Sequence, residues 1–207
     1  MPKMKLFHSP TSPFARKVRI VAHERGLTGE ITEVHSQLRT PQNEVLAHSA
    51  TGKVPCLLVE DGPDQGLTMV ESAAICEYLN TLGDAPSLQP APGGSAYWRE
   101  KALDGFAHAF LDSIAWRGRE GRRPAEEQSP GFIEIETERQ RRCFDELETL
   151  TDELDAQEIS LARILTAIAL DFYDLRIGED WRSGHPKLAA WHAKIAARRS
   201  FQTTRPA

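Results

Sequence analysis

Cysteine is scarce in this sequence. The three cysteines, Cys56, Cys76 and Cys143, lie far apart, with no CxxC pair and no Cys/His cluster at metal-ligand spacing. This pattern argues against both a disulfide framework and a structural zinc site. A small and odd number of cysteines is typical of proteins from a reducing compartment. We expect these three to be small hydrophobic residues of the core.

Long apolar runs and a dominant charge are also missing. No stretch approaches the roughly 18 apolar residues of a membrane-spanning helix, and the start MPKMKLFHSP has no apolar core or cleavage site of a signal peptide. We therefore expect a cytoplasmic protein with no membrane partner. With 25 basic and 30 acidic residues, the net charge of −5 argues against nucleic acid as the main partner.

Hydrophobic periodicity predicts strands and helices in the first part of the chain. Alternation over residues 4–7 predicts a strand, and a helical apolar face follows from Pro13 toward a C-cap at Gly26. Residues 31–35 read as a weaker strand and 44–48 as a short helix. The apolar run after Pro55 predicts a buried strand, because proline is tolerated at strand starts.

A hairpin and another helix complete this part of the chain. Residues 67–70 form the predicted return strand, and Ser72 is placed to cap a helix that starts at Ala73. Residues 83–95 hold three prolines and three glycines, which marks a linker. We expect an α/β domain over 1–82 and an all-helical domain over 96–207.

The helical domain is predicted from four apolar stripes. They lie at residues 98–110, 143–154, 161–172 and 188–195, and no convincing strand accompanies them.

Ser12 precedes Pro13, so it is the predicted N-cap of the first helix. A hydroxyl beside the positive end of a helix suits an anion such as a thiolate. Lowering a thiol pKa by about two units takes roughly 2.7 kcal/mol. One hydrogen bond to a charged group supplies about 1.5–3 kcal/mol, and the helix end supplies about 0.3–1 more. The alternative is a plain N-cap.

Two further segments offer contacts for a peptide-like ligand. A cis Val54–Pro55 bond would turn the Val54 main chain outward, free to pair with a ligand backbone, whereas the alternative is a trans proline at a strand start. At the next helix start, Ser72 and nearby N–H groups suit a carboxylate and Glu71 suits an ammonium. The alternative there is a helix start with no ligand.

A cluster of arginines follows in the helical part of the chain. Arg117, Arg119, Arg122 and Arg123 are followed by Arg139, Arg141 and Arg142. We expect solvated helix faces or salt links of a dimer, because acidic residues interleave with them. The histidines show no ligand spacing, and we assign them no role.

Taken together, these segments resemble the cytosolic glutathione transferases, as in a bacterial member of the family. SPFARKVR (12–19) resembles the tau-class start and is similar to the omega-class CPFA-x-R, with Ser in place of Cys. GKVPCL (52–57) resembles the family's cis-proline segment and ESAAICEYL (71–79) its γ-glutamyl-binding turn. WRSGHPKLAAW (181–191) and RRSFQTTRP (198–206) resemble the closing helices.

The resemblance implies a thioredoxin-like domain, an all-α domain, and an apolar electrophile site between them. It implies a homodimer that uses glutathione as co-substrate, with no cofactor and no metal. Ser12 matches the catalytic hydroxyl, with Ser9 and Thr11 as alternatives. Val54, with Pro55, matches the residue that pairs with the glutathione cysteine. Glu71 and Ser72 match the γ-glutamyl site, and Lys53 lies in the family's loop as a less certain contact. The candidate walls of the electrophile site are Phe14, Phe106, Phe110 and Tyr173, for which core packing is the alternative.

The sequence departs from the family at two positions. The family's buried helix opens with Ser/Thr-x-x-Asp, a capping box, but here Ser160 is followed by Arg163. Tau-like enzymes have a lysine before the cis-proline segment, where the nearest basic residue here is Arg39. The residue that holds the glycine carboxylate of glutathione is therefore open.

The predicted function is attack of an activated glutathione thiolate on a small hydrophobic electrophile. One alternative is a glutathione-dependent thiol/disulfide or peroxide reductase, which would favour Cys at position 12. The other is a non-catalytic interaction module with the transferase fold.

Overall fold

The computed structural model describes residues 1–155 and 158–206, which divide into two compact units. The first unit is Met1–Leu88 together with Arg199–Ala207, and the second is Gln89–Arg198. The first contains β1 (Met4–His8), α1 (Pro13–Glu24), β2 (Ile31–His35), η1 (Glu44–Ala47), β3 (Cys56–Val59), β4 (Thr68–Val70), α2 (Ser72–Thr81) and α8 (Arg199–Thr203). The second contains α3 (Ser95–Glu120), η2 (Ala125–Glu127), α4 (Pro130–Thr149), α5 (Thr151–Asp155), α6 (Leu161–Arg176) and α7 (Pro186–Ala196).

The first unit is built on a four-stranded mixed sheet in the order β2-β1-β3-β4. β1 pairs with β2 in parallel and with β3 antiparallel, and β4 is antiparallel to β3. Side chains alternate between faces along a strand. On one face Phe7 and Cys56 are paired across the strands and pack with Val45 of η1. On the other, Leu6 pairs with Leu57, and both side chains are fully buried.

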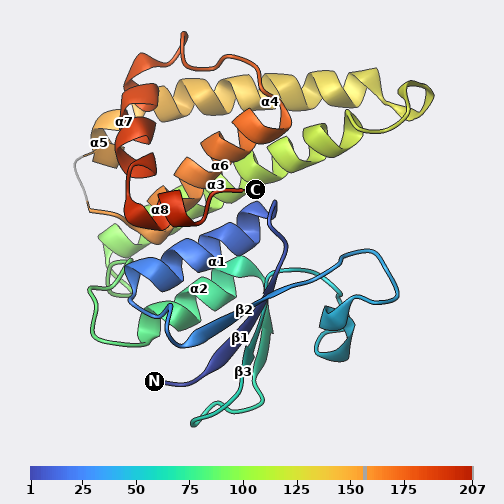
Figure 1. The fold of residues 1–207 in the computed structure, drawn as a ribbon. Helices are drawn as coiled ribbons and strands as arrows, with labels where there is room; N and C mark the ends of the chain where they lie inside the picture. The colour runs from blue at the N-terminus through green and yellow to red at the C-terminus, as the bar shows by residue number, and fades with distance from the viewer. Residues whose placement is uncertain (156–157, 207) are drawn as a thin grey trace. The chain divides into compact units, whose positions relative to one another are not determined.

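Figure 1 shows α1 and α2 side by side along one face of the sheet. The predicted strands over 31–35 and 67–70 are confirmed, with β4 one residue shorter at its start. Helix α1 ends at the cap residue Arg25, and Gly26 follows at φ 69°. The Gly26 and Leu27 N–H groups donate to the His23 and Ala22 carbonyls, which is a Schellman closure that favours glycine.

Arg25 joins the end of α1 to the segment that follows α2. The residue is 5% exposed, and its guanidinium donates to the carbonyls of Leu82, Gly83, Ala85 and Pro86, at 2.6 Å for Leu82 and 2.5 Å for Pro86. Five N–H donors in a rigid fork allow one side chain to bind several carbonyls. The first residues of the predicted linker are thus an ordered part of the first unit.

The short helix α8 packs on α1 within the first unit. Arg16 donates from Nη2 to the Phe201 carbonyl at 3.3 Å, and its guanidinium lies 5.5 Å from the centre of the Phe201 ring. Ser200 Oγ donates to Glu24 Oε1 at 2.6 Å. The sequence had placed residues 199–207 with the helical domain, whereas these contacts group them with the first unit.

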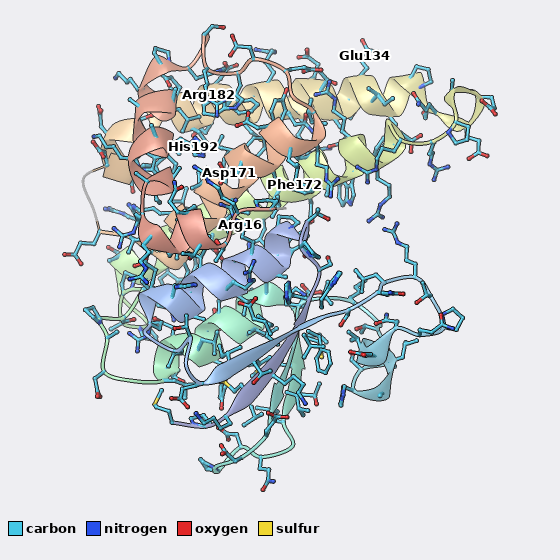
Figure 2. The ribbon with its side chains drawn as sticks, in the orientation of Figure 1. Arg16, Glu134, Asp171, Phe172, Arg182 and His192 are labelled. Atoms are coloured by element: carbon cyan, nitrogen blue, oxygen red, sulfur yellow. The ribbon has the colours of Figure 1, made fainter. Side chains whose placement is uncertain are left out.

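An aromatic cluster lies in the core of the second unit. The Phe144 ring meets the Phe110 and Tyr173 rings edge-on, at 5.1 Å and 4.8 Å, and stacks on Trp181 at 5.4 Å. Beside the cluster, His192 Nε2 of α7 lies 2.8 Å from Asp171 Oδ1 of α6, and both residues are labelled in Figure 2. Rings from α3, α4 and α6 thus share one core.

Helix α4 begins at Pro130, far ahead of the apolar stripe that predicted it from Cys143. The buried positions of its first half are the polar residues Glu136 and Gln140, so this half has no apolar stripe. Ser129 caps the helix by accepting from the Phe132 N–H at 3.4 Å. The stripe over 143–154 also spans two helices, because the helical conformation is interrupted at Leu150, between α4 and α5.

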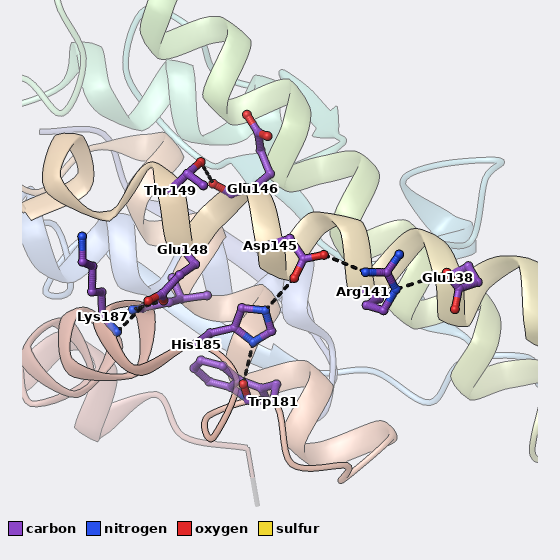
Figure 3. A network of polar contacts seen from close by, with 10 residues as sticks. Glu138, Arg141, Asp145, Glu146, Glu148, Thr149, Trp181, His185 and Lys187 are labelled. Carbon is purple, nitrogen blue, oxygen red and sulfur yellow. Dashed lines mark hydrogen bonds and ion pairs between the residues drawn. The ribbon is translucent and has the colours of Figure 1, made fainter.

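Polar contacts connect α4 to the segment that leads into α7 (Figure 3). Asp145 accepts from Arg141 Nη1 at 2.9 Å and lies 3.1 Å from His185 Nε2. Glu148 accepts from the Lys187 and Leu188 N–H groups at 3.1 Å and 2.8 Å. Because first-turn N–H groups lack partners within their own helix, Glu148 acts as the cap of α7. No helix of the described residues is long and apolar enough to cross a membrane.

Candidate functional site

The strand register brings the predicted ligand contacts to one edge of the sheet. Phe7, Cys56 and Val70 lie in one row across β1, β3 and β4. The turn after β1, the Val54–Pro55 bond before β3 and Glu71 after β4 all continue from this row on the same side. Three segments that are distant in sequence therefore meet at the carboxyl end of β1.

Ser12 occupies the N-cap position of α1, as predicted. Its backbone is extended at φ −79° and ψ 115°, and its Oγ accepts from the Ala15 N–H at 3.2 Å. Pro13 at the first helical position has no N–H to leave unpaired. Since capping uses a lone pair of Oγ, the hydroxyl proton stays available to a partner outside the helix.

The Val54–Pro55 peptide bond is cis, which is the ligand-binding alternative that the sequence left open. In the described part of the chain, no backbone hydrogen bond joins Val54 to another residue. Its N–H and C=O are therefore free for an extended ligand. Lys53, just before it, is exposed, and no described carboxylate pairs with its ammonium.

Helix α2 starts one residue earlier than predicted, at Ser72, with Glu71 at the N-cap position. The expected capping by Ser72 is therefore wrong, because Glu71 at φ 74° already turns the chain into the helix. The Ser72 Oγ is buried and has no hydrogen-bond partner among the described residues. A non-glycine residue with a positive φ, such as Glu71, costs about 1–3 kcal/mol, and residues of this kind cluster at ligand sites.

Two polar residues at the same edge were not selected from the sequence. The Nδ1 of His8, at the end of β1, and the Oγ of Ser36, directly after β2, are buried without partners among the described residues. Burial, the larger effect, lowers the pKa of His8, and Glu33 opposes the shift. His8 is the last paired residue of β1 and Ser36 follows the last paired residue of β2, and these positions at the ends of parallel strands could have identified both.

The cysteines offer no reactive thiol at this edge. Cys56 follows Pro55, but it is fully buried, and burial raises the pKa of its thiol. Burial likewise raises the pKa of the Cys143 thiol in the second unit. Buried thiols with raised pKa values are poor nucleophiles, because the thiolate is the reactive form. The described residues also contain no cluster of three or more His, Cys, Asp and Glu side chains suited to a metal ion.

The four predicted wall residues have different surroundings. Phe14 on α1 is half-buried. Phe106 on α3 is half-buried and lines a groove of about 540 Å³ in the second unit, with Leu103 and Leu150. Phe110 and Tyr173 are 0% and 5% exposed and belong to the aromatic core. Phe110 and Tyr173 therefore have the environment expected of core residues, which was the alternative to a wall of the electrophile site.

The predicted arginine cluster is only partly neutralised. Arg117 donates to both carboxylate oxygens of Glu179, at 3.2 Å for Oε2, and Tyr173 Oη donates to the same Oε2 at 2.9 Å. Burial, followed by the Glu179 contact, raises the pKa of Tyr173 to about 12. The Arg117 hydrogen bond lowers the pKa of Glu179. Arg123 pairs with Glu120 at 3.1 Å.

Comparison with known proteins matches residues 11–82 to the glutathione S-transferase N-terminal domain. The GST-like protein YibF of Escherichia coli (strain K12) is 30% identical over 206 residues, which cover 98% of each chain. A glutathione transferase family member from Pseudomonas fluorescens Pf-5, solved with bound glutathione, is 31% identical with a TM-score of 0.90, covering 99% of this chain and all of that one. The same protein with bound S-(propanoic acid)-glutathione matches at 32% identity, a TM-score of 0.88 and the same coverage. These likenesses confirm the predicted thioredoxin-like domain joined to an all-α domain.

Proposed function

This chain belongs to the glutathione S-transferase family, and we propose that it binds glutathione at the sheet edge and joins it, through its sulfur, to a small hydrophobic electrophile. The observation that carries the proposal is the convergence of three segments, which the strand register brings to one edge. Each segment offers chemistry for a different part of one tripeptide.

The γ-glutamyl group of glutathione binds at the start of α2. Its carboxylate accepts from the first N–H groups of the helix and from the Ser72 hydroxyl, which one rotation about the Cα–Cβ bond can redirect. Glu71 accepts from its ammonium. This role would explain a buried hydroxyl without a partner and a non-glycine residue at φ 74°.

The cysteinyl residue of glutathione pairs with the Val54 main chain. The N–H and C=O of Val54 exchange hydrogen bonds with the ligand backbone, as in strand addition. The Lys53 ammonium, which no described carboxylate neutralises, is the candidate for the glycine carboxylate. This orientation directs the thiol toward the turn that holds Ser12.

Ser12 stabilises the thiolate by donating its hydroxyl proton in a hydrogen bond while its oxygen continues to cap α1. The thiol proton passes to solvent. The sulfur electron pair forms a bond to the electrophilic carbon, and the leaving group departs with the electron pair of the bond that breaks. For chlorodinitrobenzene, the S–C bond forms, the C–Cl bond breaks and chloride leaves.

The relatives support this assignment. The Pseudomonas fluorescens protein, 31% and 32% identical to this chain, was solved with glutathione and with S-(propanoic acid)-glutathione, a derivative substituted at sulfur. The rival reductase chemistry is less favoured, because position 12 is Ser and burial raises the pKa of the neighbouring Cys56 thiol.

The test measures glutathione binding by calorimetry and conjugation of chlorodinitrobenzene by absorbance, in the wild-type chain and in Ser72→Ala. We expect the substitution to weaken glutathione binding by about ten-fold, since a hydrogen bond to a charged group is lost. Binding of cysteinylglycine, which lacks the γ-glutamyl group, should not change. Equal weakening for both ligands would contradict the assignment of Ser72.

Ser113→Ala is the matched control for a buried hydroxyl. Ser113 is fully buried, like Ser72, but accepts from Gln140 Nε2 at 3.2 Å. Its loss should destabilise the fold, because the buried Nε2 group of Gln140 loses its acceptor, without changing the intrinsic affinity for glutathione. Glutathione binding with no turnover of a broad electrophile panel would instead favour the non-catalytic module.

A further inference from the structure

The groove of the second unit is lined by residues of α3, α4 and α5. Its volume of about 540 Å³ lies within the range of roughly 300–1,000 Å³ that is typical of sites for small organic molecules. The apolar part of its lining consists of Ala102, Leu103, Phe106, Leu150 and Leu154. All of these residues belong to the second unit, so the groove is formed within that unit alone.

Two carboxylates and one guanidinium also line the groove. Glu146 of α4, Glu153 of α5 and Arg99 of α3 are all exposed. In the described part of the chain, no ion pair or side-chain hydrogen bond engages any of the three. Figure 3 shows the Glu146 side chain pointing away from Asp145 and His185. The lining therefore has one more negative than positive charge, and both carboxylates lack a partner.

The two carboxylates lie on the same side of the groove. Although Leu150 separates α4 from α5, its N–H donates to the Glu146 carbonyl at 3.1 Å, and its carbonyl accepts from the Leu154 N–H at 3.0 Å. The chain therefore keeps helical spacing through this residue. Positions four and seven residues apart share a helix face, which places Glu146, Leu150 and Glu153 together. Leu150 is thus flanked by two carboxylates.

The α3 side of the groove continues into an exposed aromatic ring. Trp98 is 62% exposed and lies one turn before Ala102 on the same face of the helix. The Tyr97 ring meets it edge-on at 5.1 Å. The face of an indole attracts cations, as unpaired carboxylates do. Both sides of the groove therefore favour a positively charged ligand.

We propose that this groove binds a small organic cation, a molecule with an apolar body and one ammonium group. The apolar body packs against Leu103, Phe106 and Leu150, which removes apolar surface from water. The ammonium lies beside Glu146 and Glu153, which repel an anion and gain nothing from an uncharged ligand. Glutathione has two carboxylates and is a poor ligand for this groove, so the proposal does not depend on the proposed transfer reaction.

The test compares three ligands that share one apolar body. At pH 7, 4-phenylbutylamine is a cation, 4-phenylbutanol is uncharged and 4-phenylbutyrate is an anion. In calorimetry with the full wild-type chain, we expect the amine to bind about ten-fold more tightly than the alcohol, and the anion to bind most weakly. The amine should also shift the methyl NMR signals of Leu103, Leu150 and Leu154. An amine that binds no more tightly than the alcohol, or that leaves these signals unchanged, would overturn the proposal.

Variants of single charges identify the groups that bind the ammonium. Glu146→Gln and Glu153→Gln should each weaken binding of the amine about three-fold and leave binding of the alcohol unchanged, because an exposed ion pair contributes little by itself. Arg99→Gln should strengthen binding of the amine about two-fold, because it removes a like charge. If neither glutamine variant weakens binding of the amine, the assignment of the carboxylates is wrong.

Glu134→Gln is the matched control. Glu134, labelled in Figure 2, is an exposed residue of α4 with no ion pair to any described residue. It lies roughly 18 Å from Glu146 along the helix axis. The control should bind the amine like the wild-type chain. Equal weakening in Glu134→Gln and Glu146→Gln would indicate general attraction to an acidic surface and contradict the proposed site.

Ala102→Phe tests the apolar part of the groove. Ala102 is exposed, so the larger side chain fills the groove without entering the core. Binding of both the amine and the alcohol should be lost, while circular dichroism shows an unchanged fold. Sedimentation of the wild-type chain and this variant identifies a competing occupant. If the wild-type chain binds no amine and Ala102→Phe dissociates an oligomer, a second copy of the chain occupies the groove and the proposal is wrong.

Discussion

Arg163 on α6 donates to the carboxylate of Glu100 on α3 across 3.2 Å, and both side chains are almost fully buried. Glu100 also accepts from the Ala162 N–H at 3.0 Å, while Ser160 Oγ accepts from the Arg163 N–H at 3.2 Å. The acidic residue that the capping box lacks is thus supplied by another helix. Arg163 further donates to the carbonyls of Leu154 and Glu153, at 3.0 Å and 3.1 Å.

Glu100→Ala should lower the free energy of unfolding by about 3 kcal/mol, because it leaves the buried Arg163 guanidinium without a carboxylate and the Ala162 N–H without its acceptor. Urea denaturation of the wild-type chain and the variant measures the difference. Glu138→Ala is the control, since Glu138 pairs with Arg141 at 3.2 Å on an exposed surface. The free energy of unfolding of the control should fall by less than about 1 kcal/mol. Equal losses in the two variants would contradict the expectation that the buried pair stabilises the fold more than the exposed one.

Ser12→Ala should reduce the rate of conjugation about ten- to a hundred-fold and raise the pKa of bound glutathione, because the donor to the thiolate is lost. The ultraviolet absorbance of the thiolate against pH reads the pKa directly. The substitution should also cost about 1 kcal/mol of stability, since it removes an N-cap. An unchanged thiolate titration would transfer the role to Ser9 or Thr11.

The chain contains a matched control for Ser12. Ser129 also stands at an N-cap, also precedes a proline, and its Oγ accepts from the Phe132 N–H at 3.4 Å. Ser129→Ala should therefore cost a similar amount of stability without affecting conjugation. If both alanine variants reduced activity alike, the effect of Ser12 would be one of helix stability and not of thiolate binding.

Stability should fall as the pH decreases from about 7 to about 5, in part because of His8. Burial holds the pKa of this imidazole below its ordinary value of 6.5. The unfolded chain therefore takes up the proton first, so the stability gained from neutral His8 is present above that value and is lost on acidification. Relative to the wild-type chain, His8→Asn should become progressively more stable as the pH falls. Parallel stability curves for the two proteins would contradict this expectation, and the imidazole proton signals in NMR spectra report the titration itself.

Local sequence signals predicted the first unit well. A serine before a proline marked the start of α1, and alternating apolar residues marked the strands, because each signal depends on residues a few positions apart. The sequence could not decide whether the Val54–Pro55 bond is cis or trans, nor that Glu71 adopts a positive φ. Both depend on the packing around these residues. Their convergence at one sheet edge came from the resemblance to a family and could not be derived from spacing.

Contacts between distant residues account for what the sequence did not reveal. Glu100 could not be assigned as the acceptor for α6, because 62 residues separate it from Ala162. Similarly, no local signal indicates that Arg122 and Arg176 both lie beside Gly118. The first half of α4 was missed for a different reason, since its buried positions, Glu136 and Gln140, are polar and leave no apolar stripe.

The packing of α8 on α1 makes the first unit discontinuous along the chain. A ribosome therefore synthesises the sheet and its two long helices first, then the whole helical unit, and only afterwards the segment that covers Arg16 and accepts its hydrogen bond at Phe201. Until that segment arrives, a surface of α1 that becomes buried remains open to solvent and to chaperones. In this respect the helical unit is an insertion that delays completion of the domain that it interrupts.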